Sequence, residues 1–181
     1  MTQSESSTVR PTLASLVERI HHILMRGEGV LSTGDVADLR RMDPWEIRAA
    51  GFYKLVGAVL DPDLPGDGPE RDRRETRWAA AVVGLAHLGE FHRPGVRLGS
   101  ALVQAGFSDQ RFVRLLRADS ERIVDEVPTL ARFLAAKGTP ADFTDAVRLL
   151  LSSGRSDEES VRRRIARDYY GALHQAESTH G

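Results

Sequence analysis

The stretch RDRRETRWAAAVVGLAHLGE, residues 71–90, decides the fold predicted from this sequence. Its first turns are rich in arginine, whereas its second part, from Trp78 to Leu88, is mostly apolar. A helix that is apolar around most of its circumference has to be covered by other elements on every side. We therefore expect residues 71–90 to form a long helix whose second half lies at the centre of the core.

The ten residues before this helix predict a break in the chain. Residues 61–70, DPDLPGDGPE, hold three prolines and two glycines, which neither a helix nor a central strand tolerates. They predict a loop or hinge between an N-terminal helical lobe, residues 12–60, and a basic helical bundle, residues 71–174. A disordered tail at residues 1–11 and a flexible tail at residues 175–181 are expected to flank these two parts.

Apolar residues at helical spacing predict three helices in the first lobe. The first covers residues 12–26, and the second is capped by Asp35 and ends at Met42. The third begins at Asp43, with Pro44 at its first helical position, and runs to Leu60.

The same spacing continues through the basic bundle. It predicts helices over residues 98–105, 108–118, 120–136, 140–152 and 157–174, with Asp109, Thr139 and Asp157 as caps or first-turn acids near three of their starts. No segment shows a sustained alternation of apolar and polar residues, which a half-buried strand would require. The predicted class is all-α, a two-lobed bundle of about eight to nine helices with no sheet.

Composition excludes several kinds of site. The chain has no cysteine, which excludes disulfides and thiolate chemistry and makes a reducing cytoplasm the simplest location. No stretch approaches the roughly 20 apolar residues that cross a bilayer. The six histidines form no metal-binding motif, and no phosphate-binding glycine loop follows a strand. Acidic pairs such as Glu158-Glu159 diverge by about 100° on a helix. We therefore expect no enzyme, no metal and no cofactor.

Charge is distributed unevenly along the chain. Residues 1–70 hold 7 Lys and Arg against 11 Asp and Glu, whereas residues 71–167 hold 18 against 13. In the segment DQRFVRLLRA, residues 109–118, a helix places Phe112 and Leu115 on one arc and Arg111, Arg114 and Arg117 on the other. Such a row suits a nucleic-acid backbone, which it would bind with strong salt dependence and little base specificity. A solvated face paired with local acids explains the same pattern and remains an alternative.

Three other segments of the chain also carry clusters of arginine. In VRRRIARDYY, residues 161–170, Val161, Ile165 and Tyr169 face inward and arginines spread outside, while Asp157, Glu158 and Glu159 can neutralise part of the charge. The remaining clusters are Arg71, Arg73, Arg74 and Arg77, and the pair Arg40 and Arg41. Five aromatic residues are expected to pack in the core rather than stack on bases: Trp45, Phe52, Trp78, Phe112 and Phe143.

Four stretches, taken in their order along the chain, resemble the CasB family, the small subunit of the type I-E CRISPR Cascade. They are LRRM at residues 39–42 with FYKLV at residues 52–56, LGSAL at residues 98–102, RFVRLLRAD at residues 111–119, and VRRRIARDYY at residues 161–170. The resemblance covers about residues 12–173. It implies a two-lobed helical bundle that is present as two copies in a ribonucleoprotein, together with other Cascade subunits, crRNA and the target and non-target DNA strands.

The resemblance also implies where nucleic acid is contacted. Members of the family line the guide RNA–target DNA heteroduplex and hold the displaced strand of the R-loop without catalysis. Carried over by motif, the contact residues are Arg117, Arg111, Arg114, Arg41, Arg132, Arg162 and Arg163, followed by Arg73, Arg74 and Arg164. The short loop before Leu98 and the acidic run at Asp157 depart from the family pattern and leave individual contacts open.

A protein of another class is the alternative, either a free helical regulator that binds duplex DNA or a protein–protein adaptor. A recognition helix would present Asn, Gln, Ser or Arg at its N-terminal end after a short turn. The nearest candidate, residues 98–118, has an arginine face with only Gln110 as an amide. The sequence therefore favours the Cascade subunit.

Overall fold

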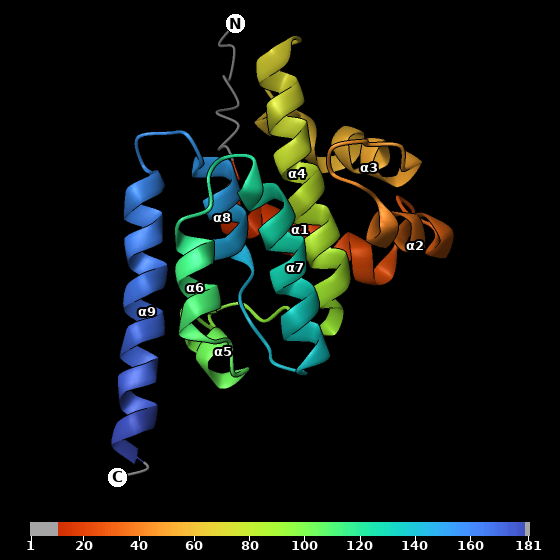
Figure 1. Cartoon of the computed structure of the whole chain (residues 1–181). Helices are drawn as coiled ribbons and strands as arrows, with labels where there is room; N and C mark the ends of the chain where they lie inside the picture. The colour runs from red at the N-terminus through yellow and green to blue at the C-terminus, as the bar shows by residue number, and fades with distance from the viewer. Residues whose placement is uncertain (1–10, 180–181) are drawn as a thin grey trace, which may run out of the picture.

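The computed structural model describes residues 11–179 and consists of helices (Figure 1). Within that range there is no strand, and two isolated bridges join Asp43 to Glu46 and His92 to Ala141. The all-α class is confirmed. The α-helices are α1 (Leu13–Arg26), α2 (Thr33–Arg41), α3 (Ala50–Leu55), α4 (Pro69–Leu88), α5 (Leu98–Gln104), α6 (Asp109–Leu116), α7 (Arg122–Ala136), α8 (Thr144–Ser152) and α9 (Glu158–Thr179).

Helix α4 lies at the centre of the molecule, as its sequence predicts. Every residue from Trp78 to Leu88 except His87 is buried, and α4 packs against α7, α2, α8 and α1. Gly84 permits the close approach of a neighbour, because a Cβ atom there would lie 2.6 Å from the Phe143 ring. The first turns of α4 extend beyond this core (Figure 1). Of their arginines, Arg73 is exposed and the others are half-buried.

Helix α9 runs along one edge of the molecule and is seated mainly on α5 (Figure 1). The seat depends on Gly99, where an added Cβ would lie 2.5 Å from the Tyr169 nitrogen and 2.6 Å from the Ile165 oxygen. Val161, Ile165 and Tyr169 are the buried residues of α9. The helix continues to Thr179, so residues 175–179, which the sequence assigns to a flexible tail, are helical.

The start of α2 corrects one predicted cap. The Ser32 hydroxyl, not Asp35, caps the helix by accepting a hydrogen bond from the Asp35 nitrogen at 3.1 Å. Asp35 accepts in return from the Ser32 nitrogen at 2.8 Å, which completes a capping box. Because a hydroxyl and an acid three residues apart satisfy each other's backbone donors, the acid occupies the third helical position and not the cap.

The third predicted helix begins later than expected. The chain turns at residues 43–46, where the Asp43 carboxylate accepts from the Trp45 nitrogen at 2.9 Å, and α3 starts only at Ala50. An aspartate that bonds to its own backbone two residues on favours a turn over a helix, and Pro44 fits the second position of that turn. Trp45 is consequently 50% exposed, so its predicted place in the core is wrong. Phe52, Trp78, Phe112 and Phe143 are fully buried, as predicted.

Helix α8 also begins later than predicted. The helix begins at Thr144 and not near residue 140, because Ala141 forms a bridge with His92. Thr139 does not cap it, since the Thr139 nitrogen donates to the Leu134 oxygen at 3.0 Å and closes the end of α7.

The predicted break contains a short 3-10 turn, Asp61–Asp63, followed by irregular chain up to Gly68. Residues from both sides of this segment, such as Ile20 and Trp78, belong to one buried cluster. The division into lobes at residues 12–60 and 71–174 stays a prediction. The predicted tail at residues 1–11 lies, apart from Pro11, outside the described residues.

Candidate nucleic-acid interface

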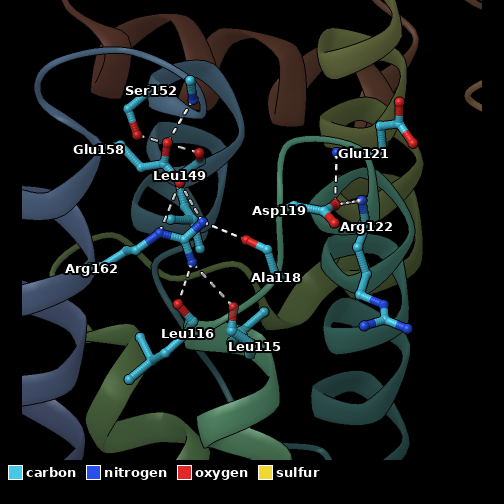
Figure 2. A network of polar contacts seen from close by, with 11 residues as sticks. Leu115, Leu116, Ala118, Asp119, Glu121, Arg122, Leu149, Ser152, Glu158 and Arg162 are labelled. Carbon is cyan, nitrogen blue, oxygen red and sulfur yellow. Dashed lines mark hydrogen bonds and ion pairs between the residues drawn. The ribbon is translucent and has the colours of Figure 1, made fainter.

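Helix α6 presents a row of three arginines, Arg111, Arg114 and Arg117 (the α6 row), and is held by α9 at three places. At its start, the Tyr170 hydroxyl donates to the Asp109 carboxylate at 2.8 Å. At its middle, Phe112 stacks on Tyr169 with ring centroids 3.8 Å apart and planes inclined by 9°. At its end, Arg162 donates to the carbonyl oxygens of Leu115 and Leu116 (Figure 2). The helix is therefore fixed in orientation along its whole length.

The exposed face of α6 matches the predicted arcs. Phe112 and Leu115 are buried, whereas Arg111, Arg114 and Arg117 are exposed. Arg114 lies 3.3 Å from a Glu126 oxygen of α7. Between residues 11 and 179, no acidic side chain pairs with Arg111 or Arg117. Two guanidinium groups of the row are thus free to bind an anionic partner.

Arg162 is the structural support of this row. Only 12% of its side chain is exposed. It donates to the Leu116 oxygen at 2.6 Å, the Ala118 oxygen at 2.6 Å and the Leu115 oxygen at 3.4 Å (Figure 2). The last carbonyls of a helix have no partner inside the helix, and a cation there also complements the helix dipole. The prediction that Arg162 contacts nucleic acid is untested, and its surroundings favour a structural role.

Glu158 completes this support. Its carboxylate accepts from both Nε and Nη2 of Arg162, and its second oxygen accepts from the Gly154 nitrogen at 2.6 Å. Burial alone would raise the pKa of Glu158, but the hydrogen bonds from Arg162 and Gly154 outweigh it and hold the pKa below its ordinary value. The acidic run that precedes the arginines of α9 therefore neutralises one of them inside the fold.

The other predicted arginines differ in how far they are paired. Arg41 and Arg163 are exposed and pair with Asp38 and Glu159, each at 2.8 Å. Arg132 and Arg73 are exposed, and no ion pair involves either of them within the described residues.

Arg74 and Arg164 are paired with acids in less exposed surroundings. Arg74 lies 2.6 Å from an Asp63 oxygen, and Arg164 lies 2.5 Å from an Asp145 oxygen. Burial raises the pKa of Asp145, against the opposing effect of Arg164 and Arg148. These two contacts tie separate elements together.

The predicted site residues do not form one patch. Arg41 belongs to α2, which lies on the far side of α4 and α7 from α9 (Figure 1). Arg73 and Arg74 line a pocket at the start of α4, whose lining includes Ser120 but none of the α6 arginines. Sequence reasoning missed Arg122, an exposed residue at the start of α7 whose backbone nitrogen binds the Asp119 carboxylate at 2.8 Å. Its signal was the acid three residues earlier, which marks the helix start.

Residues 11–179 offer neither a metal-binding cluster nor a membrane-spanning helix. No group of three or more His, Asp and Glu side chains there could hold a metal ion. In that part of the chain, none of the helices has the length and apolarity to cross a membrane.

The fold and the α6 surface define a class, that of all-helical proteins that present arginine side chains on rigid helices. The chain belongs to the Cse2 family, because the family model described as "CRISPR-associated protein Cse2" matches residues 35–170, from α2 into α9. This confirms the predicted CasB resemblance and makes the chain a subunit of a CRISPR Cascade, a structural component of that complex. Comparison with curated proteins and with solved structures gave no match.

Proposed function

We propose that this chain is the non-catalytic small subunit of a type I-E Cascade, which contacts the crRNA–target DNA heteroduplex and stabilises the displaced strand of the R-loop. Its partners would be the other Cascade subunits, crRNA, both DNA strands and a second copy of itself, in the cytoplasm. The observation that supports this proposal best is the α6 row, with Arg111 and Arg117 exposed and free of acidic partners among the described residues.

The physical argument concerns how such a surface recognises its partner. In a guide-directed complex, base pairing reads the sequence, so the protein needs to read only backbone shape and charge. Three arginines on successive turns of a fixed helix can contact successive phosphates without selecting bases. Because Tyr169, Tyr170 and Arg162 hold α6 in place, the helix backbone loses little further freedom when its arginines bind.

The remaining exposed arginines would extend this surface. Arg132 has no ion pair within the described range, and the partners of Arg41 and Arg163 are surface acids that a phosphate can replace. The partner of Arg114, Glu126, is less exposed. Arg122, exposed at the start of α7, joins this set. Arg162 and Arg164 would act indirectly, through the packing of α6 and α8 against α9.

The test uses the assembled complex. The tagged chain is co-expressed with its genomic neighbours, bound RNA is sequenced, and target-DNA affinity is measured over a range of salt concentrations. We expect a guide-containing complex whose affinity falls when the chain is omitted. The double variant Arg111→Gln/Arg117→Gln should assemble normally, bind target DNA more weakly, and reduce the slope of log affinity against log salt by about two.

Arg48→Gln is the matched control, because Arg48 is also exposed but pairs with Glu46 in the acidic first part of the chain. An assembled complex in which the double variant and the control bind DNA equally would refute the role of the α6 row. Recovery of the lone chain on duplex promoter DNA, without RNA, would instead support the free-regulator alternative.

A further inference from the structure

A pocket of about 750 Å3 opens between the first turns of α4, the end of α8 and the loop that leads into α9. Five arginines line it, and none of them belongs to the α6 row: Arg73, Arg74, Arg77, Arg148 and Arg155. A concave site with this many cations is large enough for a phosphate-bearing ligand such as a nucleotide.

The acids that line the pocket do not balance all of this charge. Asp63 is engaged by Arg74 at 2.6 Å and by the Trp78 indole nitrogen at 2.8 Å. Asp157 lies 3.8 Å from Arg155. The third acid, Glu70, is exposed at the first turn of α4.

Two of the five arginines, Arg73 and Arg77, have no acidic partner among residues 11–179. Arg148 reaches Asp145, an acid outside the lining, at 3.3 Å. For Arg73 and Arg77, no hydrogen bond or ion pair of the side chain occurs between residues 11 and 179. They are four residues apart on α4 and therefore project from the same face as like charges, which is unfavourable without an anion.

Arg77 is the more unusual of the two. It is half-buried beside Gly154 of the loop, and the carboxylate that attracts it, Glu158, already binds Arg162 and the Gly154 nitrogen. Burial, followed by the neighbouring Arg74 and Arg73, lowers the pKa of the Arg77 guanidinium. A half-buried cation among cations is stabilised by any anion that enters the site.

A neutral donor lies in the same lining. Ser153 is 1% exposed, and its hydroxyl is buried with no hydrogen-bond partner in the structure. A buried hydroxyl without a partner is costly, so an oxygen atom that reached it from the pocket would gain a hydrogen bond.

We propose that this pocket binds a phosphate group, with Arg73 and Arg77 as charged donors and Ser153 as a neutral one. The inference goes beyond the proposed function, since it concerns a second site and holds for the isolated chain. The phosphate belongs either to a nucleic-acid strand or to a free polyphosphate.

The test measures binding to the isolated full chain by calorimetry. The probes are inorganic pyrophosphate and a short single-stranded oligonucleotide. We expect pyrophosphate to bind the wild-type chain, Arg73→Gln/Arg77→Gln to weaken binding about tenfold or more, and Ser153→Ala to weaken it less. Arg48→Gln serves as the control and should leave pyrophosphate affinity unchanged. Circular dichroism verifies that each variant is folded, and the single variant Arg73→Gln replaces the double variant if the latter is not.

The outcomes separate the two sources and the two proposals. If pyrophosphate displaces the oligonucleotide and the pocket variants weaken the binding of both probes, the ligand is a nucleic-acid phosphate. If the pocket variants weaken only the binding of pyrophosphate, the ligand is a free polyphosphate. If the wild-type chain does not bind pyrophosphate, or if the pocket variants bind it as tightly as the wild type, the proposed phosphate site is wrong. Failure of the α6 row would appear in the assembled complex and leave these measurements unaffected.

Discussion

The arginine segments of α6 and α9 look alike in sequence but differ in the structure. RFVRLLR in α6 leaves Arg111 and Arg117 exposed and without acidic partners in the part of the chain that the structure describes. VRRRIAR in α9 pairs Arg162 with Glu158, Arg163 with Glu159 and Arg164 with Asp145. The difference lies in the acids around each segment. Glu158 and Glu159 lie beside Arg162 and Arg163 because an acid four residues before an arginine shares its helix face, and Asp145 of α8 lies beside Arg164. Arginine spacing indicates unpaired cations only where such acids are absent.

The largest expected effect tests the structural side of this comparison. Arg162→Met should lower the free energy of unfolding by about 3 kcal/mol, because it leaves Glu158 and the carbonyls at the end of α6 without their partner. Urea unfolding followed by circular dichroism measures the change. Arg163→Met, one residue along and exposed, should change it by less than about 0.5 kcal/mol. Equal midpoints for the two variants would mean that Arg162 is not the support of α6.

The next effect concerns the seat of α9. Gly99→Ala should destabilise the protein by about 2 kcal/mol, since the new methyl group would overlap the α9 backbone. Gly171→Ala is the matched control, because a Cβ there meets no atom within 4 Å and should stabilise the helix by about 0.5–1 kcal/mol. Thermal unfolding of both variants decides the matter, and a neutral Gly99→Ala would contradict the close packing of α5 on α9.

A smaller effect tests whether acids limit the α6 row. Glu126→Gln removes the partner of Arg114 and should raise the affinity of the assembled complex for target DNA about twofold at low salt. Glu46→Gln, which releases Arg48 away from the row, should leave that affinity unchanged. A titration in which both variants match the wild type would show that Arg114 contributes nothing to binding.

The smallest effect is a dependence of stability on pH. The pKa of Glu158 is lower in the folded protein than its ordinary value of 4.5, so its contribution to stability is complete above pH 4.5 and is lost as the pH falls through the folded pKa. In Glu158→Gln this component is missing. The unfolding midpoint of the wild type should therefore fall more steeply than that of the variant between about pH 6 and about pH 3. Parallel curves would contradict the lowered pKa.

The sequence was sufficient to predict the α4 helix and the two arcs of α6, because both depend on local apolar spacing. It misplaced Trp45, because the Asp43 turn that moves this side chain to the surface competes with a helix in ways that spacing does not reveal. It could not separate Arg162 from Arg163, since their difference arises from contact with α6, more than forty residues earlier. The α4 pocket was equally hidden, because Arg77 and Ser153 meet only in the folded chain.

The Arg162 contacts also have a consequence for the order of folding. The carbonyls at the end of α6 remain hydrated until α9 docks and supplies its guanidinium group. Contacts between residues so far apart in sequence form late, and α9 is the last helix of the described chain to leave the ribosome. The arginine row of α6 therefore acquires its final orientation only once the chain has been synthesised through α9, so a partly synthesised chain lacks this binding surface.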